Sequence, residues 1–118
     1  MIKVAIVILA DIETHEDTAR VHNALLAAKE FKDAKDEFKL IFDGTGTKWI
    51  KVLSKPEHMF HELFESLKGN STEVCSYCAG AFGVKESVTA SSIPLIEEYE
   101  GHPSFRELLL KSYQIITF

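Results

Sequence analysis

The chain has 118 residues, of which 46% are hydrophobic and 26% are charged, and this composition predicts one globular domain rather than a disordered chain. Its formal charge of −5 lacks the basic excess that nucleic acid or an anionic membrane attracts, so neither is expected as a partner. The first apolar run, residues 4–10, is much shorter than the about 20 residues of a spanning helix. Acids follow it at once, unlike in a secretory signal, so we expect a cytoplasmic protein.

Strands and helices are predicted to alternate from the N-terminus onward. Residues 4–9 form an apolar run without polar alternation, which predicts a strand that is covered on both faces. Thr14 and Asp17 have the spacing of a helix N-cap, and apolar residues then recur at helical spacing to about residue 31. Residues 38–42 are the second predicted strand.

The middle of the chain predicts two helices. The pattern over residues 47–53 indicates a short one. Ser54, followed by an early proline and an acid, is the stronger start signal and predicts a helix that ends at Gly69 and Asn70. The apolar positions of this helix define its expected buried face: Met59, Phe60, Leu63, Phe64 and Leu67.

The second half of the chain continues the alternation. Its predicted elements are a strand at 72–75, a helix at 79–87, a strand at 93–96, a helix at 103–110 and a strand at 114–118. Pro94 has no amide donor, so the fourth strand is expected to be short, bulged or at an edge. Five alternations with short, right-handed connections predict a three-layer α/β/α fold. This fold has a five-stranded, mainly parallel, flavodoxin-like sheet and forms a single domain over residues 1–118.

In such a sheet, ligands bind beyond the carboxyl ends of the strands. The loop at 11–17 contains four acids and no glycine, so it would repel a phosphate rather than bind one. The glycine-rich segment at 44–48 lacks the spacing of a phosphate-binding loop. We therefore expect no cofactor.

The main chemical signal is a CxxC motif. Cys75 ends a predicted strand and Cys78 lies at the start of a helix, where backbone dipoles stabilise thiolates and lower their pKa. This placement makes the two cysteines the candidate catalytic residues. His15 and His102 lie in loops at the same edge, and either could exchange a proton with a thiol. Two inert, buried cysteines remain an alternative.

A zinc site is a further alternative. His58 and His61 are expected on one helix face and, with the two cysteines, would supply a Cys2His2 ligand set. Their order fits structural zinc sites poorly and a doubly wound core needs no metal, so no metal is expected, although the sequence leaves this set open. A thioredoxin fold is not expected, because the CxxC follows the third strand rather than an early one.

Residues 73–84 resemble the DsrE/DsrF-like family of small sulfur-relay proteins. Members carry a cysteine at the end of the third strand, then an alanine-rich helical turn and a Gly-Val pair, here Gly83 and Val84. A stand-alone subgroup has a second cysteine three residues later and a similar closing strand, here residues 113–118. The resemblance implies that Cys75 is the sulfur-carrying residue, that the fold is flavodoxin-like and that the protein is a homo-oligomer.

The resulting hypothesis is a sulfurtransferase-like protein or persulfide sulfur carrier. Cys75 takes sulfane sulfur from a donor protein or small thiol and passes it to an acceptor, and Cys78 is the resolving thiol. Helix-dipole reasoning alone would make Cys78 the nucleophile, so the two roles remain open. A dithiol redox or redox-sensing protein and a non-enzymatic oligomeric interaction module are the alternatives. The sequence identifies neither the sulfur donor nor the acceptor.

Overall fold

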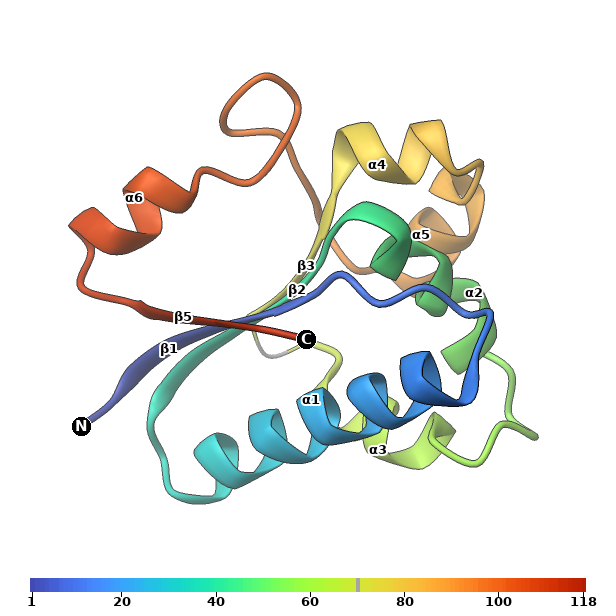
Figure 1. Ribbon diagram of the computed structural model, residues 1–118, viewed down its shortest axis with the longest axis horizontal. Coiled ribbons are helices and arrows are strands. Elements are labelled where there is room, and N and C mark those ends of the chain that lie inside the picture. Colours follow the sequence, from blue (N-terminus) through green and yellow to red (C-terminus); the bar gives the residue numbers. More distant parts are fainter. Residues whose placement is uncertain (70) are drawn as a thin grey trace.

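Five parallel strands form one sheet in the order β4-β3-β2-β1-β5 in the computed structural model, which describes residues 1–69 and 71–118 (Figure 1). Parallel pairing brings the carboxyl ends of all the strands to the same end of the sheet. The strands are β1 (Lys3–Ile8), β2 (Glu37–Phe42), β3 (Thr72–Cys75), β4 (Leu95–Ile96) and β5 (Gln114–Thr117). The predicted α/β fold with its five-stranded parallel sheet is therefore confirmed.

Helices cover both faces of the sheet. Helices α1 and α3 lie on one face and α6 on the other, while α2, α4 and α5 gather where β1 to β3 end (Figure 1). The helical elements are α1 (His15–Asp33), the 3-10 helix η1 (Gly44–Lys48), α2 (Trp49–Leu53), α3 (His61–Leu67), α4 (Ser76–Ala81), α5 (Lys85–Ser91) and α6 (Phe105–Leu110). In the described part of the chain, no helix combines the length and the apolar character that a membrane crossing requires.

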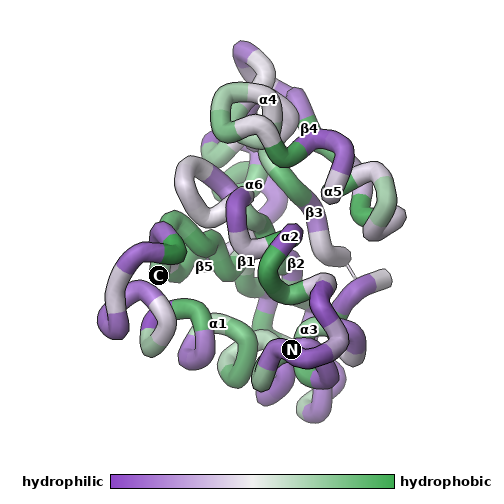
Figure 2. Tube along the Cα trace, turned by 90° about the vertical axis from the view of Figure 1, so that its right-hand side faces the viewer, coloured by the Kyte–Doolittle hydropathy of each residue, from purple (hydrophilic) through white to green (hydrophobic). Residues whose placement is uncertain are grey.

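The core follows from the unbroken apolar run of β1. Side chains alternate between the two faces of a strand, so Ile6 and Ile8 enter the larger hydrophobic cluster, while Val7 enters a smaller one with Leu108 of α6 and with Tyr113. Figure 2 shows the hydrophobic residues gathered along the central strands. A strand buried on both faces holds the carboxyl edge of the sheet in place.

The predicted start of α1 is confirmed in detail. The Thr14 side chain accepts a hydrogen bond from the Asp17 amide at 3.1 Å, and the Asp17 carboxylate accepts one from the Thr14 amide at 3.0 Å. This capping box satisfies two amides that have no partner within the helix.

The helix predicted from residue 54 begins later than expected. Residues 54–60 form successive turns, and α3 starts at His61. The ring of His58 accepts the amide of Phe60 at 3.0 Å, a local bond that competes with the helical pattern. Met59, predicted to be buried, is 81% exposed for this reason. The predicted buried positions 60, 64 and 67 are buried, and the predicted stop at Asn70 lies outside the described residues.

The helix predicted over 79–87 is divided in two. Helix α4 ends at Ala81 and α5 begins at Lys85, because Gly83 has a φ of +69° that a helix cannot include. The fourth strand is a two-residue edge strand, as the position of Pro94 predicted.

Candidate functional site

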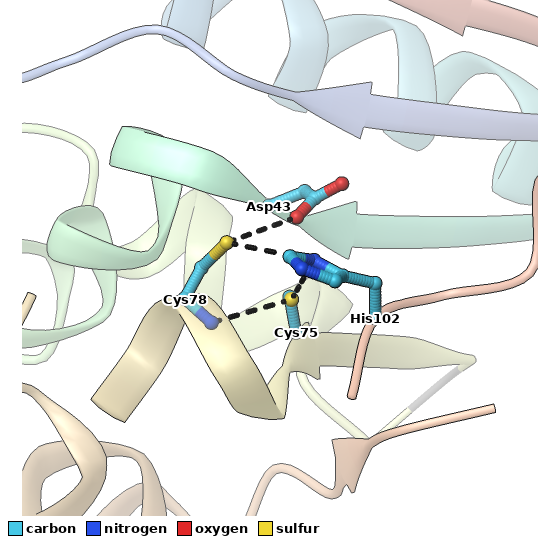
Figure 3. Close-up of side chains that lie close together, drawn as sticks. All are labelled: Asp43, Cys75, Cys78 and His102. Carbon is cyan, nitrogen blue, oxygen red and sulfur yellow. Dashed lines mark hydrogen bonds between the residues drawn. The ribbon is translucent and has the colours of Figure 1, made fainter. Parts of the chain in front are cut away.

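Four side chains with sulfur, nitrogen and oxygen donors meet at the carboxyl edge of the sheet (Figure 3). We call Asp43, Cys75, Cys78 and His102 the site quartet. Asp43 follows β2 directly, Cys75 ends β3, Cys78 lies in α4 and His102 lies between β4 and α6. The four donor atoms all lie within 4.8 Å of one another.

Cys75 is both the last residue of β3 and the N-cap of α4. Its Sγ accepts a hydrogen bond from the amide of Cys78 at 3.4 Å, in the way a serine or aspartate caps a helix. No loop separates the strand from the helix, so the sulfur sits against the first turn of α4. Both cysteines are free and buried, with exposed fractions of 0% and 8%.

His102 is the group nearest to Cys75. Its Nδ1 lies 3.3 Å from the Cys75 Sγ and 3.8 Å from the Cys78 Sγ. In the tautomer with a lone pair on Nδ1, the imidazole accepts a proton from either thiol. This residue was one of the two histidines predicted at the edge.

A tight turn holds the imidazole in place. Tyr99 and His102 exchange two backbone hydrogen bonds, of 2.9 and 2.8 Å, across this turn. Gly101 has a φ of +82°, and its carbonyl accepts the amide of Tyr77 at 2.9 Å. The Tyr77 ring lies 4.8 Å from the His102 ring, so the CxxC segment and the histidine loop position each other.

Asp43 supplies the negative charge of the quartet. It is 8% exposed, and its Oδ1 accepts the amide of Gly44 at 2.8 Å and lies 3.6 Å from the Cys78 sulfur. In the described part of the chain, no lysine or arginine forms an ion pair with it. The described contacts of this carboxylate are therefore with neutral groups, the Gly44 amide and the Cys78 thiol.

Burial determines the protonation state of Cys75. Desolvation raises the pKa of the thiol to about 12, the charge of Asp43 adds to this effect, and the amide of Cys78 opposes it. The amide at the start of α4 does lower this pKa, but one amide does not offset the loss of water. At neutral pH, Cys75 is therefore a thiol.

The other predicted histidines lie apart from the quartet. His15 begins α1 on the surface. His61 places its Nδ1 2.7 Å from the carbonyl of Leu53, and His58 accepts the Phe60 amide. Among the described residues, neither His58 nor His61 joins the cysteines, so the structure does not assemble the Cys2His2 set.

Sequence reasoning assigned no role to Asp43. The available signal was its position directly after the second strand, at the edge where the third strand ends in Cys75. Using that signal requires knowing that β2 and β3 are neighbours, which the pairing of Phe42 with Val74 shows.

The chain is therefore a small parallel α/β domain that carries a cysteine pair at the carboxyl edge of its sheet. The sequence pattern of the DsrE/DsrF-like family matches residues 3–118, so the chain belongs to this family. Membership supports a role like that of sulfur-relay proteins.

The chain is also similar to two other proteins. The chain is 35% identical over 94 residues to the uncharacterized protein MJ0733 of Methanocaldococcus jannaschii, a match that covers 80% of this chain and 76% of that protein. Its fold is similar to the structure of BT1422, a conserved protein of unknown function from Bacteroides thetaiotaomicron, with a TM-score of 0.64. That match has 22% identity over 97% of this chain and 94% of the other, and it supports the fold alone.

Proposed function

We propose that the protein is a sulfurtransferase-like sulfur carrier that holds sulfane sulfur as a persulfide on Cys75. The observation that carries this proposal is the 3.3 Å approach of the His102 Nδ1 to the Cys75 Sγ in a protein of this family. A buried thiol with a raised pKa is a weak nucleophile by itself, and a base in contact with it removes that obstacle. The partners would be sulfur donor and acceptor proteins or small thiols in the cytoplasm.

The uptake step is a thiol exchange without net oxidation. His102 takes the proton of Cys75, and the resulting thiolate attacks the outer sulfur of a donor persulfide, R–S–SH. A bond forms between the Cys75 Sγ and that sulfur while the S–S bond of the donor breaks. The proton returns to the leaving thiolate, so Cys75–SH and R–S–SH become Cys75–S–SH and R–SH.

The amide of Cys78 assists this step. It donates to the Cys75 Sγ at 3.4 Å, and it therefore opposes the cost of forming a buried anion there. The charge of Asp43 acts in the opposite sense, since it raises the pKa of Cys75. The anion is then favoured only while His102 carries the transferred proton nearby.

Two routes release the sulfur. An acceptor thiolate can attack the outer sulfur and leave Cys75 as a thiol. Alternatively, the Cys78 thiolate attacks the Cys75 Sγ, the S–S bond to the outer sulfur breaks, and hydrosulfide leaves as an intramolecular disulfide forms. In the second route the cysteines are oxidised and the sulfane sulfur is reduced, so a dithiol reductant must restore the protein.

The test is an intact mass measurement of reduced, chelator-treated protein after incubation with polysulfide, followed by peptide mapping. We expect one added sulfur on Cys75 in the wild type and in Cys78→Ser, and none in Cys75→Ser. Uptake by Cys75→Ser equal to that of the wild type would overturn the proposal. Sulfur mapped to Cys78 would also overturn the assignment and would reverse the two roles.

A dithiol redox function is the second candidate, because the two sulfur atoms lie within 4.8 Å of each other. In the same experiment this function would give a Cys75–Cys78 disulfide in the wild type and no added sulfur in Cys78→Ser, whereas a carrier that resolves through Cys78 would keep its added sulfur in that variant. A reduction potential close to that of the cytosolic thiol pool would then support a redox sensor.

We also propose that the protein is a homo-oligomer, as the family resemblance implies. The exposed apolar side chains of α6, including Leu109 and Leu110 at 61% and 65% exposure, support this. The molar mass measured by light scattering tests it, and a monomer at micromolar concentration would refute it.

A further inference from the structure

We propose that the reduced site quartet is also a binding site for a single tetrahedral zinc ion. This inference goes beyond sulfur carriage, since it concerns a metal that would occupy the same side chains in place of sulfur. It also replaces the ligand set that the sequence suggested, because Asp43 and His102 take the places of His58 and His61.

The spacing of the donor atoms fits a zinc shell. Zinc lies about 2.3 Å from a thiolate sulfur and about 2.0 to 2.1 Å from imidazole nitrogen or carboxylate oxygen, so a tetrahedron places sulfur about 3.5 Å from nitrogen or oxygen. The Nδ1 of His102 lies 3.3 and 3.8 Å from the two sulfurs, and the Asp43 Oδ1 lies 3.6 Å from the Cys78 sulfur. No pair of donors is more than 4.8 Å apart, so closing the shell requires shifts of about 1 Å.

The chemistry of the donors favours zinc over the hard cations. Two thiolates with an imidazole are soft and borderline ligands, whereas magnesium and calcium prefer shells of oxygen. A single carboxylate completes four ligands of the kinds that zinc binds in proteins.

The charge of the site quartet also favours a bound cation. Asp43 is buried, and no lysine or arginine of the described residues pairs with it. Lys48 is nearby in sequence but pairs with Asp11 instead, at 3.1 Å. A divalent cation would supply the positive charge that the protein does not, and the two thiols would lose their protons on binding.

The contacts around the quartet orient its ligands. The Gly44 amide donates to the Asp43 Oδ1, and the Cys78 amide donates to the Cys75 Sγ. The Tyr77 ring packs on the imidazole. Such outer contacts hold metal ligands in a binding geometry and strengthen binding.

Zinc and sulfur would exclude each other at this site. The metal would use the lone pairs of the Cys75 sulfur that the uptake step needs, so zinc-loaded protein would take up no sulfane sulfur. This consequence rests on the proposed function, whereas zinc binding does not.

The experiment is a titration of reduced, chelator-stripped protein with cobalt(II), followed by zinc(II). We expect one equivalent of cobalt to produce the visible bands of a tetrahedral ion and a sulfur-to-cobalt charge-transfer band, both removed by one equivalent of zinc. Asp43→Asn and Cys78→Ser should each weaken zinc binding at least tenfold, since loss of supporting contacts alone costs 10- to 100-fold. His61→Gln, which changes a histidine outside the quartet, should bind as the wild type does. Circular dichroism confirms that each variant is folded.

Three results would overturn the inference: no tetrahedral cobalt spectrum in the wild type, unchanged zinc affinity in folded Asp43→Asn, or affinity lost in His61→Gln. Sulfur uptake by the stripped protein is measured separately. Uptake without zinc binding refutes this inference alone, and zinc binding without uptake refutes only the proposed function.

Discussion

Two segments at the carboxyl edge of the same sheet, the loop after β1 and the end of β3, differ in their electrostatics. After β1, Asp11 is paired with Lys48 at 3.1 Å, and its side chain is 28% exposed. The amide of Ile12 and then Lys48 hold the pKa of this carboxyl below its usual range. At the end of β3, Cys75 is fully buried and its pKa is raised to about 12. The Asp11 carboxylate is ionised and paired with a lysine, whereas the Cys75 thiol is protonated and neutral.

The difference shows that position at a sheet edge does not by itself make an ionised or reactive group. Water and a counter-charge stabilise the anion in the loop after β1, and burial removes both from the end of β3. The chemistry proposed for Cys75 therefore relies on a neighbouring base, whereas Asp11 needs none to stay ionised.

Among the substitutions that test this difference between Asp11 and Cys75, His102→Gln is expected to have the largest effect. Without the base beside a thiol of raised pKa, the rate of persulfide formation at pH 7 should fall about 100-fold or more, the usual contribution of general base catalysis. This rate is measured by quenching the reaction at successive times and determining the mass of the protein in each sample. His15→Gln is the matched control, because that histidine lies at the same edge outside the quartet. A rate within twofold of the wild type in His102→Gln would show that Cys75 needs no base.

A further effect is expected in the pH dependence of Cys75 once the base is removed. Alkylation of the double variant Cys78→Ser/His102→Gln should accelerate about tenfold per pH unit from pH 7 to 9 without a plateau, because the thiolate fraction rises steadily below a pKa of about 12. Adding Asp43→Asn removes a charge that raises this pKa, so the rate at a fixed pH should increase several-fold. Asp11→Asn should leave the rate unchanged. A plateau near pH 7 would mean that the site already holds a thiolate.

The smallest effect is expected from Lys48→Met, which removes the cation paired with Asp11. The ion pair with Asp11 is partly exposed, and exposed pairs contribute under about 1 kcal/mol to stability. The substitution also removes the cation–π contact of the Lys48 Nζ with Phe82, whose ring centroid lies 5.2 Å away, and this contact adds a similarly small amount. Urea unfolding and the sulfur uptake rate check this. A tenfold slower uptake would show that the two segments are coupled.

Much of the fold was predictable because its signals are local. The apolar run of β1, the capping box at Thr14 and the proline in the fourth strand each act through neighbouring residues. The two exceptions were also local in cause. The His58 side chain takes an amide that the expected helix would have used, so α3 begins at His61, and Gly83 with its φ of +69° divides the helix expected over residues 79–87.

Only part of the candidate site could be predicted from the sequence. Cys75 and Cys78 were found from their spacing and from the family resemblance, and His102 was one of two histidines at the edge. Nothing local distinguishes His102 from His15, because the contact with Cys75 spans 27 residues and depends on the turn at Gly101.

By itself, the sequence determined the alternation of strands and helices, the family and the cysteine pair, since these depend on residue order and short-range hydrogen bonding. The tertiary structure alone decided that Asp43 lies beside the thiols, that the His102 ring contacts Cys75 and that the pKa of Cys75 is raised. Those properties arise from strand order and burial, which bring distant residues together and exclude water from between them.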